Sequence, residues 1–168
     1  MRLFFAILPG RHLAGTLHGL ARPLTRRCRG RLVPQGSLHL TLAFLGEVAP
    51  QRLDELRRIG SQLPHAAGAP WQLDQVGSWH GGIVWAGASQ PCPALDELAA
   101  ALRSALAAAG FGLEQRAYLP HVTLLRHARQ LLPTHAITPL AYPLRRISLM
   151  ASTLTPQGAH YRELAHWP

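Results

Sequence analysis

Two segments with the pattern His-x-Thr-x lie far apart in the chain: HLTL at residues 39–42 and HVTL at residues 121–124. Each lies inside a longer run with strand-like composition, residues 37–45 and residues 118–125. Successive side chains of a β-strand point to opposite faces, so the His and the Thr of each motif share one face. The apolar residues of each motif point to the other face, where a core would bury them. Each motif therefore presents an imidazole and a hydroxyl side by side.

The surroundings of the two motifs are also repeated. An apolar run at residues 3–6 is followed by a helix-capable segment and the first motif, and a run at residues 83–86 is followed in the same way by the second. The distance from the end of each run to the motif histidine is 33 residues in one case and 35 in the other. An internal duplication leaves such a pattern. We therefore expect a single domain, residues 1–168, built from similar halves of about 1–80 and 81–168, with the two motifs facing each other across a cleft.

Hydrophobic spacing predicts the remaining elements. Helices are expected at residues 10–20, 51–63 and 93–109, with Pro23 ending the first and Gly110 the third. Strands are expected at residues 3–8, 38–45, 71–76, 83–86, 117–125, 144–153 and 161–165. The Pro- and Thr-rich stretch 126–141 is expected to form a loop. This order predicts an α+β fold, with two pseudo-symmetric lobes of mostly antiparallel sheet, helices outside and an active-site cleft between the lobes.

The lengths of the apolar runs argue against a membrane-spanning protein and against a secreted one. No apolar run approaches the roughly 20 residues of a membrane-spanning helix, and the N-terminal run in MRLFFAILPG is shorter than the roughly 7–15 residues of a signal-peptide core. We therefore expect a cytoplasmic protein that does not contact a membrane. The only cysteines, Cys28 and Cys92, are expected to be free thiols.

Several segments carry a resemblance to a known family. They are RLFFAILP at residues 2–9, LHLTLAFLGE at 38–47, IVWAG at 83–87 and PHVTLLR at 120–126. With these segments the chain resembles the 2H phosphoesterase superfamily, which is defined by the paired His-x-Thr motif. Within that superfamily it resembles the bacterial RNA 2′,3′-cyclic phosphodiesterases, historically called 2′-5′ RNA ligases. The resemblance extends over essentially the whole chain.

The residues of the motifs suit acid–base chemistry at phosphorus. Imidazole has an ordinary pKa near neutrality, so one histidine can be neutral while the other is protonated. On opposite sides of a phosphodiester, His39 and His121 can divide the work, one accepting a proton from an attacking water and the other donating a proton to the departing oxygen. The Thr41 and Thr123 hydroxyls can donate hydrogen bonds to the non-bridging oxygens. Because the motifs are symmetric, the residues themselves leave open which histidine is the acid.

The resemblance implies a reaction and assigns the two roles. The implied reaction is hydrolysis of RNA 2′,3′-cyclic phosphodiester ends to 2′-phosphomonoesters, with His39 as proton donor and His121 as proton acceptor. The implied substrate is RNA with a 2′,3′-cyclic phosphate end or a cyclic nucleotide, and no obligate protein partner is expected. Two alternatives remain: 2′-5′ RNA ligase or 2′-5′ phosphodiesterase activity, and a non-catalytic protein that binds RNA ends. Intact His and Thr in both motifs favour an enzyme over the latter.

No metal or cofactor is expected. Catalytic zinc sites use three protein ligands, and neither motif carries Asp, Glu or Cys within three residues of its histidine. Among the aromatic residues, Phe5 and Tyr118 are candidates for contacting a nucleobase because each lies near an element expected to form the cleft. The eight other histidines show no repeated context and are expected to be structural or exposed.

One arginine breaks the symmetry of the motifs. Arg126 stands five residues after His121, whereas Phe44 stands five residues after His39. The resemblance implies that Arg126 contacts phosphate, and a guanidinium suits that task. An odd offset places Arg126 on the wrong face of a regular strand, so it reaches the phosphate only if the strand ends or turns there. The alternative is an exposed arginine beside Arg129.

The net charge of +9 admits two interpretations. A basic surface concentrates phosphate ligands. All 17 basic residues are Arg, however, which also fits the codon usage of a GC-rich genome. A cluster within residues 22–31 is expected either to contact RNA or to be a solvated loop. Its members are Arg22, Arg26, Arg27, Arg29 and Arg31.

Overall fold

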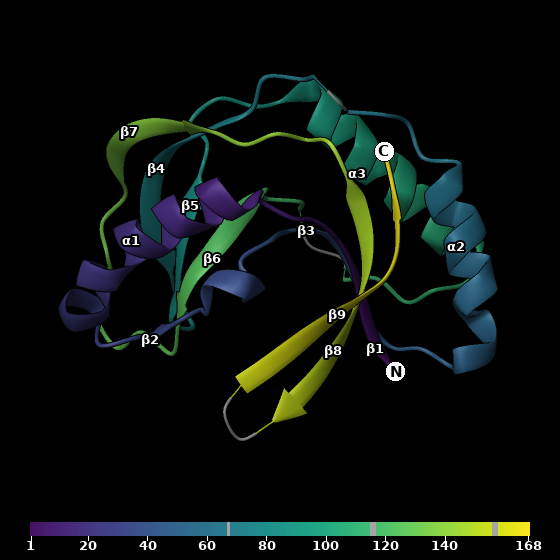
Figure 1. The fold of residues 1–168 in the computed structure, drawn as a ribbon, viewed down its shortest axis with the longest axis horizontal. Coiled ribbons are helices and arrows are strands. Elements are labelled where there is room, and N and C mark those ends of the chain that lie inside the picture. Colours follow the sequence, from purple (N-terminus) through teal and green to yellow (C-terminus); the bar gives the residue numbers. More distant parts are fainter. Residues whose placement is uncertain (67, 115–116, 156–157) are drawn as a thin grey trace.

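The computed structural model describes residues 1–66, 68–114, 117–155 and 158–168. Its elements follow in the order β1 (Arg2–Ile7), α1 (Arg11–Cys28), β2 (Arg31–Leu32), η1 (Gln35–Ser37), β3 (Leu40–Glu47), η2 (Pro50–Arg52), α2 (Leu53–Ser61), β4 (Gln72–Trp79), β5 (Ile83–Gly87), α3 (Pro93–Ala108), β6 (His121–Arg126), β7 (His135–Ala141), β8 (Ile147–Thr155) and β9 (Gly158–Trp167) (Figure 1). The predicted α+β class is confirmed.

All strand pairs are antiparallel, and the main path through the sheet is β7-β4-β5-β6-β3-β1-β8-β9, with β2 paired to β6. The centre of this path is narrow, because β3 and β6 share the single pair Leu40↔Val122. We call β3-β1-β8-β9 the first lobe and β6-β5-β4-β7 the second lobe. Read outward from the centre, each lobe begins with the strand that carries a His-x-Thr motif.

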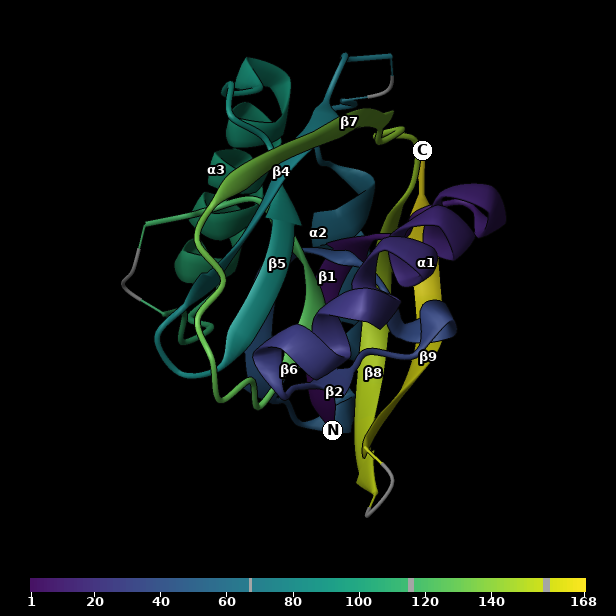
Figure 2. The ribbon, with the colours of Figure 1, turned by 90° about the vertical axis from the view of Figure 1, so that its left-hand side faces the viewer.

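The lobes do not coincide with the two halves of the sequence. Strand β4 comes from the first half but pairs with β5 in the second lobe, and β8 and β9 come from the second half but join β1 in the first lobe. Figure 2 shows β8 and β9 running side by side along one edge of the molecule. The halves, divided near residue 80, therefore exchange their outer strands, and the duplication itself remains a proposal.

The helices cover one side of the sheet. Helix α1 packs against β6 and β2 of the second lobe, whereas α3 packs against β3 and α2 packs against β8 and β9. In Figure 1, α1 lies beside the second lobe at left and α2 and α3 lie at right. The main core lies between helices and sheet, and it includes the motif residues that were expected to point inward: Leu40, Leu42, Val122 and Leu124. Within the described residues, no helix is long and apolar enough to span a membrane.

Two local predictions are wrong. Pro23 does not end the first helix, which continues to Cys28 with Pro23 inside it. Pro23 is exposed while Ala21, Leu24 and Cys28 are buried, so burial of the far end of the helix offsets the lost main-chain hydrogen bond. The predicted loop 126–141 contains β7, an edge strand whose residues are mostly exposed and therefore show no hydrophobic alternation. The two cysteines are buried free thiols, as expected.

Candidate active site

The single pair between β3 and β6 brings the two motifs together. Leu40 and Val122 each follow the histidine of their motif. In this antiparallel register, His39 lies across from Thr123 and Thr41 lies across from His121. All four side chains are half-buried, whereas Leu40 and Val122 are fully buried on the opposite face. The expected imidazole–hydroxyl face is therefore present in both lobes, and each histidine lies beside the threonine of the other motif.

Both histidines are held by the same local hydrogen bond. His39 Nδ1 lies 2.7 Å from the carbonyl oxygen of Ser37, and His121 Nδ1 lies 2.7 Å from the carbonyl oxygen of Leu119. A carbonyl oxygen only accepts, so each Nδ1 carries the proton and donates it. This bond fixes the ring orientation and leaves Nε2 as the nitrogen available for proton transfer.

Aromatic side chains surround His39. Its ring centroid is 4.9 Å from that of Phe4 and 5.1 Å from that of Tyr161, which stands edge-on at 87°. Burial is the main cause that lowers the pKa of His39 to about 4, and the charges of Arg126 and His121 lower it further, against the opposing effect of the Ser37 carbonyl. In the free protein His39 is therefore neutral at neutral pH.

An aromatic side chain also flanks the second histidine. The ring of Trp79 stands at 78° to that of His121 with centroids 4.5 Å apart, and Trp85 lies behind Trp79 at 5.3 Å. Trp79 and Tyr161, both half-buried, thus flank the two imidazoles from the two lobes. The sequence does not select Trp79 or Tyr161 over the other aromatic residues, because Trp79 lies on β4 and Tyr161 on β9, far in sequence from the motif that each contacts.

A β-bulge follows the threonine of each motif. The pairs on either side of the bulges are Ala6↔Thr41 and Phe5↔Ala43 in the first lobe, and Trp85↔Thr123 and Val84↔Leu125 in the second. The residue skipped is Leu42 in one motif and Leu124 in the other, at the same place in each. Bulges re-aim side chains and are common next to active sites. This repeated irregularity supports the proposal that the two halves have a common origin.

The bulge resolves the position of Arg126. Leu124 and Leu125 are both fully buried, so the alternation shifts by one residue and Arg126 falls on the face of His121. The charge of Arg126 is among the causes that lower the pKa of His39, so the guanidinium acts electrostatically on the first motif as well. Phe44 occupies the equivalent place in the first lobe, paired with Phe4. An odd offset from His121 would place Arg126 on the wrong face of a regular strand. This does not apply here, because the bulge makes β6 irregular.

Comparisons with known proteins show the family to which the chain belongs. The family model of the 2′-5′ RNA ligase superfamily matches residues 9–155. The chain belongs to this superfamily. It is 35% identical to the RNA 2′,3′-cyclic phosphodiesterase of Escherichia coli over 99% of this chain and 95% of that protein. It is 26% identical to the RNA 2′,3′-cyclic phosphodiesterase of Thermotoga maritima over 98% of this chain and 93% of that protein. The crystal structure of Escherichia coli LigT complexed with 3′-AMP superimposes with a TM-score of 0.83 at 31% identity, covering 99% of this chain and 96% of that chain.

The structure contradicts one of the two predicted nucleobase contacts. Phe5 is fully buried in the main core against Trp167, because it points to the helix side of β1, so its assignment to the cleft is wrong. Its neighbour Phe4 is the residue that faces His39. Tyr118 packs against the main core, and its hydroxyl donates to the carbonyl oxygen of Thr41 at 3.3 Å. Burial raises the pKa of Tyr118, and these contacts hold its half-buried side chain beside the first motif, so its contact with a nucleobase stays a prediction.

The basic cluster divides into two parts. Arg22, Arg26 and Arg27 are exposed on α1, where Arg26 and Arg27 lie in the last turn and complement the helix dipole. Arg29 caps that helix in the left-handed conformation with φ 50°. Arg31 is separate, because it lies on β2 and pairs with β6. Within the described part of the chain, no group of three or more His, Cys, Asp or Glu side chains could hold a metal ion.

Proposed function

We propose that the chain is a cytoplasmic RNA 2′,3′-cyclic phosphodiesterase that forms 2′-phosphomonoesters by two-histidine catalysis without a metal. The observation that carries this proposal is the pair of imidazoles, each held through Nδ1 and each beside a threonine, on neighbouring motifs of one sheet. Support comes from relatives in the same superfamily that are named RNA 2′,3′-cyclic phosphodiesterase. The substrate would be RNA with a cyclic phosphate end or a cyclic nucleotide.

The proposed reaction is an in-line displacement. His121 Nε2 accepts a proton from water while the water oxygen forms a bond to phosphorus, and the bond from phosphorus to the 3′ oxygen breaks on the opposite side. His39 Nε2 donates its proton to the departing 3′ oxygen, and the bond to the 2′ oxygen remains. The hydroxyls of Thr41 and Thr123 and the guanidinium of Arg126 stabilise the charge on the non-bridging oxygens.

If His39 is the proton donor, binding of the substrate must change the protonation state of the His39 imidazole. A donor must carry its proton in the complex, yet burial and neighbouring positive charge lower the pKa of His39 to about 4 in the free protein. A bound phosphodiester places a negative charge beside the ring and offsets the charge of Arg126, so it favours the imidazolium. The proposed acid therefore becomes charged as the substrate binds.

We expect His39 to titrate at about 4 in the free protein and at a higher pH in the complex with adenosine 2′-phosphate. The bound anion stabilises the protonated ring, and the direction of the shift follows from charge alone. NMR titration of the histidine side chains measures both values, with the His39→Gln variant to assign the signal. An unchanged pKa in the complex would make His39 the base and reverse the two roles.

Turnover of adenosine 2′,3′-cyclic phosphate in the presence of EDTA tests the proposed function. We expect accumulation of the 2′-phosphate at the same rate with and without EDTA. Loss of activity on chelation, restored by zinc, would contradict the metal-free mechanism. A dinucleotide with a 2′-5′ linkage is the second substrate, and its faster cleavage would favour 2′-5′ phosphodiesterase activity. Binding without turnover of either compound would favour the RNA-end-binding alternative.

A further inference from the structure

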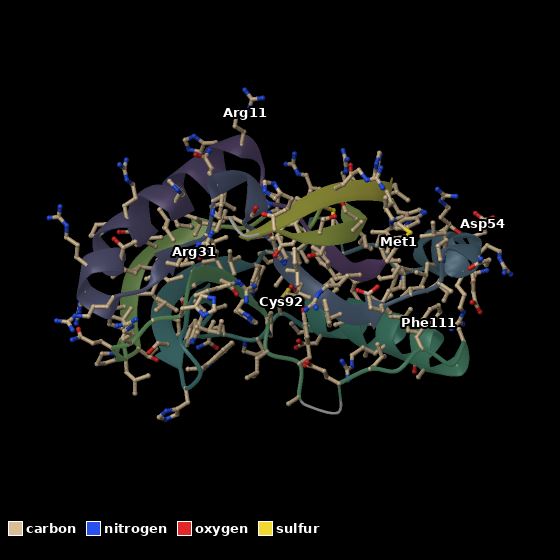
Figure 3. All side chains as sticks on the ribbon, turned by 90° about the horizontal axis from the view of Figure 1, so that it is seen from below. Met1, Arg11, Arg31, Asp54, Cys92 and Phe111 are labelled. Carbon is tan, nitrogen blue, oxygen red and sulfur yellow. The ribbon has the colours of Figure 1, made fainter. Side chains whose placement is uncertain are left out.

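Arg31 lies directly opposite Arg126 in the two-residue ladder between β2 and β6. The neighbouring pair is Leu32↔Leu125, in which Leu125 is fully buried and Leu32 packs against the main core. Alternation therefore sends both arginines to the opposite face, which is the face of the two motifs. Figure 3 labels Arg31 over the strands of the sheet, whereas Arg11 extends from α1 into solvent.

Two like charges at this spacing repel each other. Residues directly opposite in an antiparallel pair have Cα atoms about 4.5–5.5 Å apart, and like charges there are destabilising. Among the residues that the structure describes, neither arginine forms an ion pair with a carboxylate, in contrast to Arg52, Arg57 and Arg146. A ligand with negative charge, bound between the two guanidinium groups, would turn this repulsion into attraction.

We propose that Arg31 and Arg126 form a clamp for the reacting phosphate. This inference rests on the proposed function and adds a second guanidinium to it. The cyclic diester carries a single negative charge, whereas the product 2′-phosphomonoester carries about −1.5 to −2 at pH 7. A second guanidinium therefore contributes most to binding of the product and of the transition state that leads to it. The clamp also places positive charge at the β2–β6 end of the motif face, so it orients the phosphate relative to His39 and His121.

Calorimetric binding of adenosine 2′-phosphate tests the clamp without depending on turnover. We expect Arg31→Gln to weaken binding by about 10- to 100-fold, the usual effect of a charge-assisted hydrogen bond. Arg31→Lys should recover part of the loss, because it keeps the charge but not the planar fork. The double variant with Arg126→Gln should lose less than the product of the two single losses, because both side chains bind one phosphate. Arg26→Gln, on α1, is the matched control and should bind like the parent.

Thermal unfolding separates a binding role from a structural one. Without ligand, Arg31→Gln should keep or raise the melting temperature, because it removes a repulsion. Adding adenosine 2′-phosphate should raise the melting temperature of Arg31→Gln by less than it raises that of the parent. A variant that is destabilised without ligand and binds the mononucleotide normally would overturn the inference. A variant that binds adenosine 2′-phosphate normally but binds a dinucleotide with a 2′-phosphate end more weakly than the parent would also overturn it. Arg31 would then bind the phosphate of the preceding nucleotide. If the parent binds the product but does not turn over the cyclic nucleotide, the proposed function fails instead.

Discussion

Replacing either motif histidine with alanine is expected to lower kcat by about 10²- to 10⁴-fold, the usual contribution of a positioned acid or base. Substrate binding should change less, because neither imidazole is the main anchor of the phosphate. Steady-state kinetics of His39→Ala and His121→Ala on adenosine 2′,3′-cyclic phosphate measures both parameters.

His135 provides a matched control for this prediction. Its Nδ1 lies 2.9 Å from the carbonyl oxygen of Pro133, two residues earlier, so it repeats the local hydrogen bond of the motif histidines. It lies on the edge strand β7 and is exposed. His135→Ala should therefore keep the activity of the parent. Full activity in either motif variant would contradict the two-histidine mechanism.

Replacing Arg126 with alanine is expected to weaken binding of adenosine 2′-phosphate by about 10- to 100-fold, because a charge-assisted hydrogen bond contributes about 1.5–3 kcal/mol. Turnover should also slow, since the same contact stabilises charge that develops at phosphorus. Arg126→Lys should recover only part of the loss, because an ammonium lacks the planar fork. Calorimetry with the product gives the affinities.

The control for Arg126 is Arg129, whose main-chain nitrogen donates to the carbonyl oxygen of Cys28 and whose side chain is exposed. Arg129→Ala should bind the product like the parent. If Arg126→Ala binds and turns over like the parent, its side chain does not contact the phosphate despite its place on the motif face.

The motif residues could be placed from the sequence because their arrangement depends on local alternation. His39 and Thr41 share a face in any strand, and the apolar residues between and after them were expected in the core, where they lie. The repeat predicted the meeting of the two motifs, since two similar lobes bring equivalent strands to one junction. The pair Leu40↔Val122 is that junction.

Other features could not be predicted because they depend on contacts distant in sequence or on irregular geometry. Strand β1 is apolar on both faces, so its pattern does not show whether Phe4 or Phe5 points to the cleft. Tyr161 reaches His39 only because β9 follows β8 and β8 pairs with β1. The bulge at Leu124 leaves no recognisable signature in the sequence, yet it decides the direction of Arg126.

The dependence of kcat/KM on pH tests the two-histidine claim most directly. This parameter reports ionisations of the free enzyme, and a bell shape arises when one group must be neutral and another protonated. Because the pKa of His39 is lowered to about 4, its protonation state changes at the acidic side of the profile. We predict that kcat/KM rises with pH through about 4 and falls at higher pH, and that both limbs belong to the coupled pair of histidines. Because His39→Ala removes the group that must be protonated, its residual activity should lose the fall at higher pH and keep the rise. A profile that is flat between pH 3.5 and 8 would contradict the mechanism, and a steady rise toward alkaline pH would point instead to a metal-bound hydroxide.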